Sequence, residues 1–505
     1  MQIEPQATAF AKRYARREAQ VVWTSLVSDL ETPVSAFLKV AGARPMSFLL
    51  ESVEGGAVRG RYSIIGLDPD LVWRTVAGRA EINRGIRHQP DSFAPCNEAP
   101  LAALRALIAE SRIELPDVLP PMAAGIFGYL GYDMVRLMEE LPQPNPDPIG
   151  IPDAVLVRPT IVVVFDAVKD AITVVTPVRP QNSITADTAF ARARERLSAI
   201  IDALDAPLAH SPPTLQAGPL TVWPSSNTTP AEYERMVSAA KEYIAAGDIF
   251  QVVLSQRFEA PFELPPFALY RALRRVNPAP FLYFLDFGGF SIVGSSPEIL
   301  VRVREGTVTI RPLAGTRPRG ATPNQDKALE TELLADEKER AEHLMLLDLG
   351  RNDVGRVART ASVKVTDQFF IERFSQVMHI VSNVEGQLDG KYDALDALAA
   401  GFPAGTVSGA PKVRAMEIID ELEQEKRGLY AGSVGYFSAA SELDSCIVLR
   451  TALIKDGVMY VQAGAGIVAD SNPKSEQQEC VDKAKALFRA AEEAKRFASA
   501  ARRGQ

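Results

Sequence analysis

The chain has 505 residues, 47% of them hydrophobic, which is enough for about two to four domains around a large core. Its formal net charge of −8 provides no basic excess to neutralise phosphates, and this excludes nucleic acid as the main partner. The odd number of well-separated cysteines (Cys96, Cys446 and Cys480) excludes a disulfide framework and favours a reducing cytoplasm.

The first half alternates short β-type runs with Gly and Pro turns, as in FLLESVEGG, AAGIFGYLGYD and PTIVVVFDAVKDAITVVTPV. One helical stretch, NEAPLAALRALIAESR, interrupts them. The most apolar segment is broken by Arg158, Pro159 and Asp166 and is too short to span a membrane. Because the N-terminus also has no apolar core of signal-peptide length, we expect a cytoplasmic protein with no membrane partner.

A stretch rich in Pro, Ser and Thr separates the two halves of the chain. Such composition with weak periodicity is typical of a domain boundary. We therefore expect an N-terminal domain at 1–205, a linker at 206–228 and a second domain at 229–505.

The second half opens with a strong helix signal. Thr229 is a good N-cap, Pro230 suits the first helical position, and Glu232 completes a capping box. This helix is predicted to stop near Gly247. Many strand-like runs mixed with long helices follow, which indicates a large layered core of the α+β or α/β class.

Two pairs of glutamates are the most informative feature of this half. Glu339 and Glu342 lie in DEKERAEHLMLLDLGRND, and Glu476 and Glu479 lie in SNPKSEQQECVDKAKALF. In a helix, an i, i+3 spacing puts both carboxylates of a pair on one face. Four such charges brought together require a cation, and hard oxygen ligands favour Mg²⁺. On spacing alone, two solvated acidic helix faces are the simpler interpretation.

Glycine turns and basic residues add further candidates. Ala463–Gly466 (AGAG) lets backbone amides approach an anion but lacks the third glycine of a dinucleotide fingerprint. Arg311–Gly320 (RPLAGTRPRG) places a Gly-Thr corner among arginines, which suits a carboxylate ligand. Arg450 ends an apolar strand and either snorkels or faces an anion. His379 has apolar neighbours, and a satisfied core histidine is the default interpretation.

Ten sequence blocks in this half resemble the chorismate-utilising enzyme family. In chain order they are GDIFQVVLSQRF, NPAPFLYF, VGSSPEIL, PLAGTRPRG, ERAEHLMLLDLGRND, VMHIVSNVEG, FPAGTVSGAPK, GLYAGSVGYF, CIVLRTAL and AGAGIVADSNPKSEQQE. The first half, with LLESVEGGAVRGRYSIIG and FGYLGYD, resembles the N-terminal domain of the anthranilate synthase branch of that family. The resemblance implies an α+β fold with a large two-lobed layered β-sheet core flanked by helices, preceded by a β-rich regulatory domain.

The resemblance also implies a ligand set. The glutamates that match Glu342 and Glu479 hold Mg²⁺, with Glu339 and Glu476 nearby, and the metal binds the ring carboxylate of chorismate. Arg450, Lys483 and the backbone amides suit the pyruvyl carboxylate. The residues that match chorismate contacts are Gly315, Thr316, Tyr430, Arg450, Gly464, Ala465, Gly466 and Lys483.

Two positions discriminate among members of the family. Water-adding members carry a lysine base where this chain has Gln251, which cannot deprotonate water, so ammonia is the expected nucleophile. Aminodeoxychorismate synthases carry a nucleophilic lysine where this chain has Ala314. The expected reaction is therefore direct amination of chorismate at C2, loss of the C4 hydroxyl as water, and pyruvate elimination to anthranilate, the first committed step of tryptophan biosynthesis.

Three further residues receive roles in this reaction. Glu298 is the candidate general acid for loss of the C4 hydroxyl, since a carboxylic acid in a closed site has a raised pKa. His379 matches the histidine associated with pyruvate elimination. Thr406 lies in a loop that matches the active-site wall.

Partners and regulation follow from the same resemblance. No cysteine lies on a nucleophile elbow, so a separate glutamine amidotransferase subunit is expected to supply ammonia, in a heterotetramer of two large and two small subunits. Tryptophan is the expected feedback inhibitor. Its site is expected at Leu50, Glu51, Ser52, Pro280, Phe281 and Leu282. The alternatives are an aminodeoxychorismate synthase, or a catalytically silent subunit that senses tryptophan.

Overall fold

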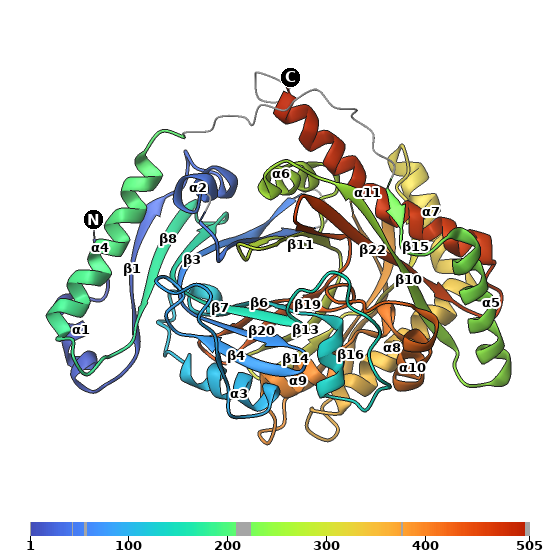
Figure 1. The fold of residues 1–505 in the computed structure, drawn as a ribbon, viewed down its shortest axis with the longest axis horizontal. Coiled ribbons are helices and arrows are strands. Elements are labelled where there is room, and N and C mark those ends of the chain that lie inside the picture. Colours follow the sequence, from blue (N-terminus) through green and yellow to red (C-terminus); the bar gives the residue numbers. More distant parts are fainter. Residues whose placement is uncertain (1, 43, 55–57, 209–223, 375–376, 500–505) are drawn as a thin grey trace.

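The computed structural model describes residues 2–42, 44–54, 58–208, 224–374 and 377–499, so the middle of the expected linker lies outside the described residues. Helices and strands in these ranges form one layered α+β structure (Figure 1). The strands are β1 (Gln20–Val27), β2 (Ser47–Glu54), β3 (Val58–Val76), β4 (Arg79–Asn83), β5 (Ala94–Pro95), β6 (Gly125–Leu130), β7 (Ala154–Asp166), β8 (Ala171–Val178), β9 (Ser225–Ser226), β10 (Gln251–Pro261), β11 (Phe281–Asp286), β12 (Ser291–Ser296), β13 (Ile299–Arg304), β14 (Thr307–Ile310), β15 (Leu313–Pro318), β16 (Lys364–Arg373), β17 (Val377–Gln387), β18 (Gly409–Ala410), β19 (Ser433–Ser438), β20 (Leu443–Ile447), β21 (Thr451–Lys455) and β22 (Val458–Ile467). The helices are α1 (Ala7–Ala15), α2 (Pro33–Val40), α3 (Pro100–Glu110), α4 (Ala186–Asp205), α5 (Pro230–Ala246), α6 (Pro266–Val276), α7 (Pro323–Ala335), α8 (Glu337–Gly355), α9 (Ala394–Gly401), α10 (Lys412–Leu422) and α11 (Pro473–Ser499), with short 3-10 turns η1 (Pro121–Ala123), η2 (Tyr132–Leu137) and η3 (Gly405–Val407).

One antiparallel sheet connects both halves of the chain. A first run of neighbouring strands has the order β10, β22, β21, β12, β11, β2, β3 and β7. A second run continues from β7 through β6, β19, β20, β13, β14 and β17. Strands β2 and β6 of the first half thus pair directly with β11 and β19 of the second. Whether the halves divide regulation and catalysis between them stays a prediction.

The two runs fold back on each other and enclose an aromatic core. Phe48 of β2 stacks on Phe127 of β6 with ring centroids 4.7 Å apart, and Tyr436 of β19 packs against Phe127 at 5.4 Å. Tyr283 of β11 is buried in the same cluster. The expected layered α+β class with a large sheet core is therefore confirmed.

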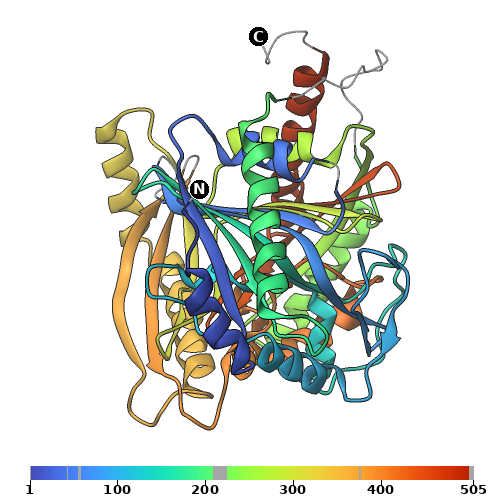
Figure 2. The same cartoon turned by 90° about the vertical axis from the view of Figure 1, so that its left-hand side faces the viewer.

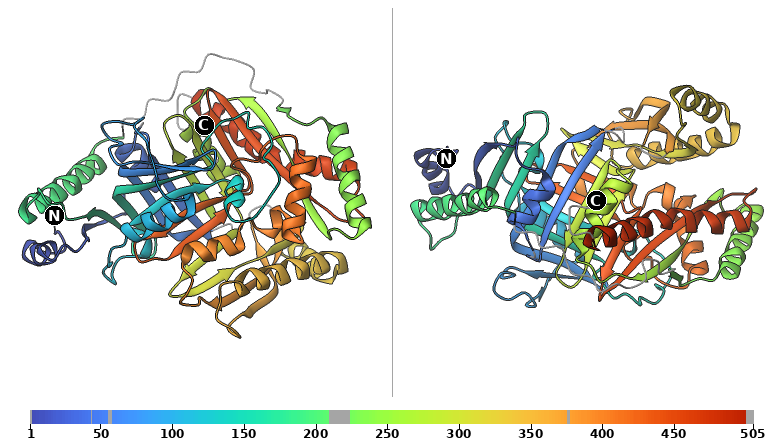
Figure 3. Two further views of the ribbon diagram at one scale, coloured as in Figure 1. Left: turned by 60° about the horizontal axis from the view of Figure 1, so that its bottom comes forward. Right: turned by 90° about the horizontal axis from the view of Figure 1, so that it is seen from above.

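Helices cover the outer faces of the sheet. Figure 2 shows α4 lying across β1 and β8, and α11 (red in Figure 1) crosses the other end beside α5. Seen from above, α7 and α8 on one side and α11 on the other form two arms at the right of the molecule (Figure 3). Both predicted glutamate pairs lie on these arms, because Glu339 and Glu342 belong to α8 and Glu476 and Glu479 to α11.

The predicted start of the second half is confirmed at α5. The Thr229 hydroxyl accepts from the Glu232 amide, and the Glu232 carboxylate accepts from the Thr229 amide, which is the expected capping box. Gly247 ends the helix with φ of +85°, a left-handed conformation that glycine adopts without strain. The helical region before Gly350 is divided, since Asp336 caps α8 directly after α7.

Removal of this cap is expected to destabilise the fold measurably. Thr229→Ala removes the acceptor of the Glu232 amide and is expected to lower the free energy of unfolding by about 1 kcal/mol. Ser238→Ala on the same helix is the matched control, because the exposed Ser238 hydroxyl only bonds back to the Glu234 carbonyl. Urea denaturation of the two variants compares them, and equal losses would contradict the capping role.

Candidate active site

The predicted site residues come together where the two arms meet the edge of the sheet. Gln251 begins β10 and bonds to Glu342 of α8 at 3.1 Å. Lys483 of α11 donates to the Gly464 carbonyl at 2.8 Å, and Arg450 and Lys483 both act electrostatically on His379 of β17. The structure thus joins residues that are more than two hundred positions apart in the sequence.

His379 is held in a defined orientation. Its Nδ1 lies 2.9 Å from the Gly315 carbonyl oxygen and 3.1 Å from the Thr316 hydroxyl, so Nδ1 carries the proton and donates it to the carbonyl. Its Nε2 is buried and has no partner among the described residues. Burial lowers the pKa of this imidazole to about 4, with Arg450 and Lys483 adding to the effect. The ring is therefore neutral, and the lone pair of Nε2 has no hydrogen-bond partner among the described residues.

Gly315 creates the contact with His379 through a β-bulge. The register of β15 against β17 shifts between Ala314 and Thr316, and Gly315 has φ of +69°. A Cβ at this position would also lie 3.2 Å from the Glu339 carboxylate. The Gly-Thr corner predicted from the sequence is thus a bulge within a strand.

Arg450 brings an unpaired cation to the site. Its backbone has φ of +48°, a left-handed conformation that a non-glycine residue adopts at a cost of about 1 kcal/mol or more. Burial lowers the pKa of its guanidinium, and no carboxylate in the described ranges pairs with it. A half-buried cation without a partner is unfavourable, so this position is suited to an anionic ligand.

The end of β22 provides close backbone approach. A Cβ at Gly464 would lie 2.8 Å from the Tyr430 hydroxyl, and a Cβ at Gly466 would lie 2.7 Å from the Gln251 amide nitrogen. Ala465 between them is fully buried. A Cβ at Gly464 would collide with the Leu254 carbonyl oxygen, so glycine is needed there for close packing, and the role of this segment in ligand binding stays a prediction.

Glu298 is a buried carboxyl group with a strongly shifted pKa. Its side chain follows β12, and burial raises its pKa to about 8, although Thr406 and the Leu313 amide act in the opposite direction. The Thr406 hydroxyl faces this carboxyl without a well-aligned hydrogen bond to any described group. Glu298 therefore holds a proton at neutral pH, the property predicted for a general acid.

Repulsion between carboxylates links the glutamates of α8 to those of α11. Glu339 and Glu479 both repel Glu342 and raise its pKa, after the larger effect of burial. Glu339 pairs with Arg317 at 3.3 Å, and Glu479 pairs with Lys483 at 2.7 Å. Within the described ranges, no three His, Cys, Asp or Glu side chains are close enough to hold a metal. Mutual repulsion with few direct ligands fits Mg²⁺, which binds one or two carboxylates and keeps several waters.

The residues expected to bind an effector lie on two faces of one strand pair. Ser52 opposes Phe281 and Glu51 opposes Leu282. Leu50 and Phe281 contact the core between the two sheet runs, whereas Leu282 packs in the cluster beneath the outer helices. Glu51 bonds to Tyr270 and forms an ion pair with Arg274 of α6 at 2.7 Å. The structure therefore brings Leu50, Ser52 and Phe281 together but not Glu51 and Leu282 with them. Pro280 is half-buried immediately before β11.

Sequence reasoning missed a buried ion pair that supports the site from behind. Arg427 bonds to Glu423 at 2.6 Å, donates to the carbonyls of Val253 and Val407, and lies over the Tyr430 ring at 5.5 Å. Glu423 also accepts the amide and hydroxyl of Ser255. The pair ties β10, η3 and Tyr430 together. The i, i+4 spacing of a glutamate and an arginine in ELEQEKR was the one available signal.

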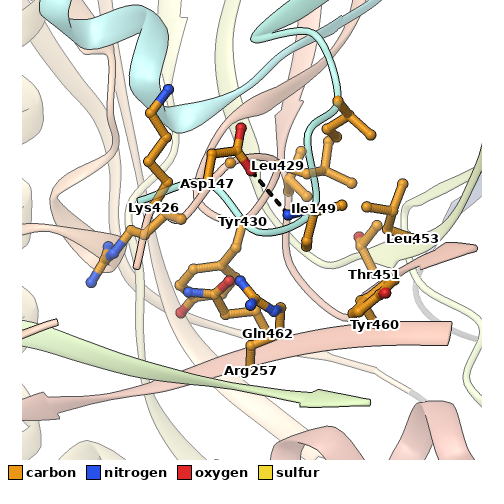
Figure 4. A pocket seen from close by; sticks show the side chains of 14 residues that line it. Asp147, Ile149, Arg257, Lys426, Leu429, Tyr430, Thr451, Leu453, Tyr460 and Gln462 are labelled. Carbon is orange, nitrogen blue, oxygen red and sulfur yellow. Dashed lines mark hydrogen bonds between the residues drawn. The ribbon is translucent and has the colours of Figure 1, made fainter. Parts of the chain in front are cut away.

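A small pocket is lined by Tyr430 and by residues around it. Figure 4 shows Asp147, Lys426, Arg257 and Gln462 around it, with apolar side chains such as Leu453 completing the wall. Its volume of about 30 Å³ accommodates water but no larger ligand.

None of the helices in the described ranges is long and apolar enough to cross a bilayer.

Comparisons with known proteins agree with this geometry. Residues 63–489 match the family model described as chorismate binding enzyme. Anthranilate synthase component 1 of Cereibacter sphaeroides is 57% identical over 503 residues, covering 98% of this chain and 99% of the relative. The same component of Aquifex aeolicus is 48% identical over 472 residues, with 93% and 94% covered.

Solved structures are similar along the same length. Anthranilate synthase component I of Streptococcus pneumoniae superposes with a TM-score of 0.74 at 38% identity, covering 92% of this chain and 99% of that one. The menaquinone-specific isochorismate synthase MenF of Escherichia coli gives a TM-score of 0.70 at 21% identity, covering 96% and 100%. The second similarity concerns the fold alone.

The raised pKa of Glu298 predicts a pH-dependent stability. Between the ordinary pKa of 4.5 and about 8, the folded protein holds a proton that the unfolded chain releases, so stability falls as pH rises through this interval. Glu298→Gln removes this dependence and is expected to stabilise the fold at pH 9 by on the order of 1–4 kcal/mol and to leave it unchanged near pH 4. Urea denaturation at both pH values measures the difference. The exposed Glu337→Gln is the control, and equal pH profiles for Glu298→Gln and the unmodified chain would refute the assignment.

Proposed function

The chain belongs to the chorismate binding enzyme family, and we propose that it is the large subunit of an anthranilate synthase. Relatives named anthranilate synthase component 1 along nearly the whole chain support this proposal. The observation that carries it is Arg450, a half-buried guanidinium with no carboxylate partner in the described ranges, beside the neutral His379. Chorismate has two carboxylates, and its pyruvyl carboxylate supplies the charge that Arg450 lacks.

Lys483 and the Gly464–Gly466 backbone complete the proposed carboxylate site. Lys483 already contacts the Gly464 carbonyl, so its ammonium lies beside the backbone groups that would approach the ligand. The Tyr430 hydroxyl lies beside Gly464, and the Thr316 hydroxyl lies beside His379. This set binds an anion at one end of the substrate and leaves the ring free to face Glu298 and His379.

Glu342 and Glu479 are the residues that would hold Mg²⁺, with Glu339 and Glu476 nearby. A bound Mg²⁺ would screen these carboxylates from the dianionic substrate and polarise the ring carboxylate during attack at C2. Burial raises the pKa of Glu476, and Glu479 adds repulsion, so this pair is also more stable with a cation present.

Glu298 acts first in the proposed sequence. Ammonia forms a bond to C2, the bond from C4 to its oxygen breaks, and Glu298 gives its proton to the departing oxygen, which leaves as water. Gln251 donates to Glu342 and has no basic group, so ammonia attacks without deprotonation by this side chain. The buried Ala314 offers no covalent nucleophile, which favours attack at C2 over delivery to C4.

His379 acts second. Its protonated Nδ1 is fixed by Gly315, so Nε2 is the basic atom that would take the C2 proton while pyruvate departs. A pKa of about 4 keeps this nitrogen free of a proton at neutral pH. Loss of the C2 proton and of the pyruvyl oxygen makes the ring aromatic.

Ammonia is supplied by a separate glutamine amidotransferase subunit in this proposal. Burial raises the pKa of the Cys480 thiol to about 11 and that of Cys446 still further, so neither is a reactive thiolate at neutral pH. Cys96 also has a raised pKa. Two large and two small subunits form the proposed assembly, and the cytoplasm is the proposed location.

Tryptophan is the proposed inhibitor, at the face of β2 and β11 that carries Leu50, Ser52 and Phe281. This face turns toward the core between the sheet runs. Glu51 and Leu282 support it from the other face, where Glu51 anchors α6 through Arg274.

The direct test of this function mixes the purified chain with chorismate, Mg²⁺ and excess ammonium at alkaline pH. Anthranilate fluorescence should develop without any amidotransferase, since free ammonia replaces the missing subunit. Chorismate consumption without this fluorescence would point to the 4-amino isomer, which chromatography separates. No consumption would refute the enzymatic assignment in favour of a silent tryptophan-binding subunit.

The metal assignment predicts the loss of activity in two variants. Glu342→Gln and Glu479→Gln are each expected to reduce turnover by about 100-fold or more while the protein stays folded, because the proposed cation loses an anionic ligand. Calorimetric titration of Mg²⁺ in the presence of chorismate should show weaker binding. Glu337→Gln, one helical turn before the site on α8, is the matched control. Normal Mg²⁺-dependent turnover in either variant would disprove the assignment.

The effector assignment predicts a separate phenotype. Ser52→Phe fills space next to Phe281 and is expected to abolish inhibition by tryptophan, while kcat and KM for chorismate change by no more than about twofold. Inhibition curves for Ser52→Phe and for the exposed Ser25→Phe on β1 provide the comparison. Unchanged inhibition in Ser52→Phe would place the effector elsewhere.

A further inference from the structure

A second cavity adjoins Glu298, and neither Arg450 nor the Gly464–Gly466 segment lines it. Its walls come from the start of β13, from η3 and from α8, and its volume is about 30 Å³. A buried water occupies about 10–15 Å³ by this measure, so the cavity has room for about two waters. Ile299, Leu346 and Leu349 form its apolar lining.

Polar groups at this cavity match what buried waters require. Glu298, Thr406 and Asp353 all line it. The Thr406 hydroxyl faces the Glu298 carboxyl, but it has no well-aligned hydrogen bond to any described residue. A buried water needs two to four polar partners, and these three side chains supply them. An orphaned buried hydroxyl beside a cavity of this size indicates ordered water.

Asp353 forms the outer end of the cavity. It pairs with Lys412 of α10 at 2.9 Å, and the side chains of Lys412 and Asp353 are 9% and 8% exposed. Burial raises the pKa of Asp353, while Lys412 and the more distant Arg356 oppose this rise. This carboxylate lines the cavity and keeps only 8% of its side chain exposed to solvent, and it accepts a proton more readily than an exposed aspartate.

We propose that Asp353, the waters of this cavity and the Thr406 hydroxyl form a relay that returns a proton to Glu298 after each turnover. This inference rests on the proposed acid role of Glu298. In the addition step Glu298 loses its proton to the departing water, and the new ammonium group at C2 releases a proton to solvent. The relay draws one proton from solvent through Asp353, so the exchange balances and no oxidant or reductant is involved.

The relay supplies Glu298 with protons by a route that does not pass through the substrate. Bound chorismate would close the substrate side of Glu298 during the reaction, whereas this cavity adjoins Glu298 through walls that include neither Arg450 nor His379. A relay of this kind affects only turnovers after the first, because the resting enzyme already holds a protonated Glu298.

Asp353→Asn tests the relay by separating the first turnover from later ones. In rapid-mixing experiments with chorismate, Mg²⁺ and ammonium, the first turnover should keep its rate within about twofold, followed by steady-state turnover reduced about tenfold or more. Small weak acids such as imidazolium should restore steady-state turnover in proportion to their concentration. Asp348→Asn on the same helix, which removes only an exposed pair with Arg351, is the control and should show neither effect.

A second variant tests whether the effect of Asp353→Asn comes from a less stable fold. Asp353→Asn leaves Lys412 buried without its partner, whereas the double variant Asp353→Asn/Lys412→Met removes both charges. Both variants should show the same loss of steady-state turnover and the same rescue. Equal slowing of the first and later turnovers, absence of rescue, or normal steady-state turnover would each overturn the relay. Failure of the unmodified chain to form anthranilate would instead refute the proposed function itself.

Discussion

Hydrogen-bonded pairing between strands of the two halves is the constraint on which the structure depends. β2 joins β11, and β6 joins β19, so neither half completes a sheet by itself.

This continuous sheet also connects the proposed effector face to the proposed active site. Four neighbouring strands place one residue each in a continuous row, in the order Leu50, Tyr283, Gly294 and Thr451. The Tyr283 hydroxyl lies 2.6 Å from that of Thr451, the residue that follows Arg450. Gly294 makes this possible, since a Cβ there would lie 2.2 Å from the Tyr283 ring. A ligand at β2 and β11 that moves Tyr283 would therefore act directly on the strand that holds Arg450.

Ionisable groups in unfavourable surroundings identify the chemistry better than the apolar core does. Arg450 is an unpaired cation with a strained backbone, and Glu298 is a buried acid with a pKa of about 8. Each reduces the stability of the fold in the absence of ligand. By contrast, Arg427 and Glu423 are more deeply buried than Arg450 but form an ion pair with each other, and Arg427 also donates to backbone carbonyls behind the site. The presence or absence of a partner therefore distinguishes residues that need a ligand, such as Arg450, from residues that only support the site, such as Arg427 and Glu423.

Local signals were predictable from the sequence, and long-range orientation was not. The capping box at Thr229 and the helices that carry both glutamate pairs depend on neighbouring residues, so the sequence sufficed. The direction of Glu51 depends on Arg274 and Tyr270, which lie on a helix more than two hundred residues later. The strand alternation that sends Glu51 and Ser52 to opposite faces is a local rule, but nothing local shows which face meets α6. For the same reason the cavity beside Glu298 could not be predicted from any single segment, because β13, η3 and α8 build it together.

The short strand β15 holds the proposed acid and the proposed base at a fixed separation. The Leu313 amide acts on the Glu298 carboxyl and opposes the rise in its pKa. Two residues later, the Gly315 carbonyl fixes the His379 ring, and the Thr316 hydroxyl supports the same nitrogen. The bulge at Gly315 allows adjacent backbone and side-chain groups to face one imidazole, which a regular strand would direct to opposite faces. A protonated carboxyl and a neutral imidazole are thus positioned by the same three residues of chain. Because both reacting steps concern one ring, this shared support lets the substrate remain in place while the acid acts first and the base second.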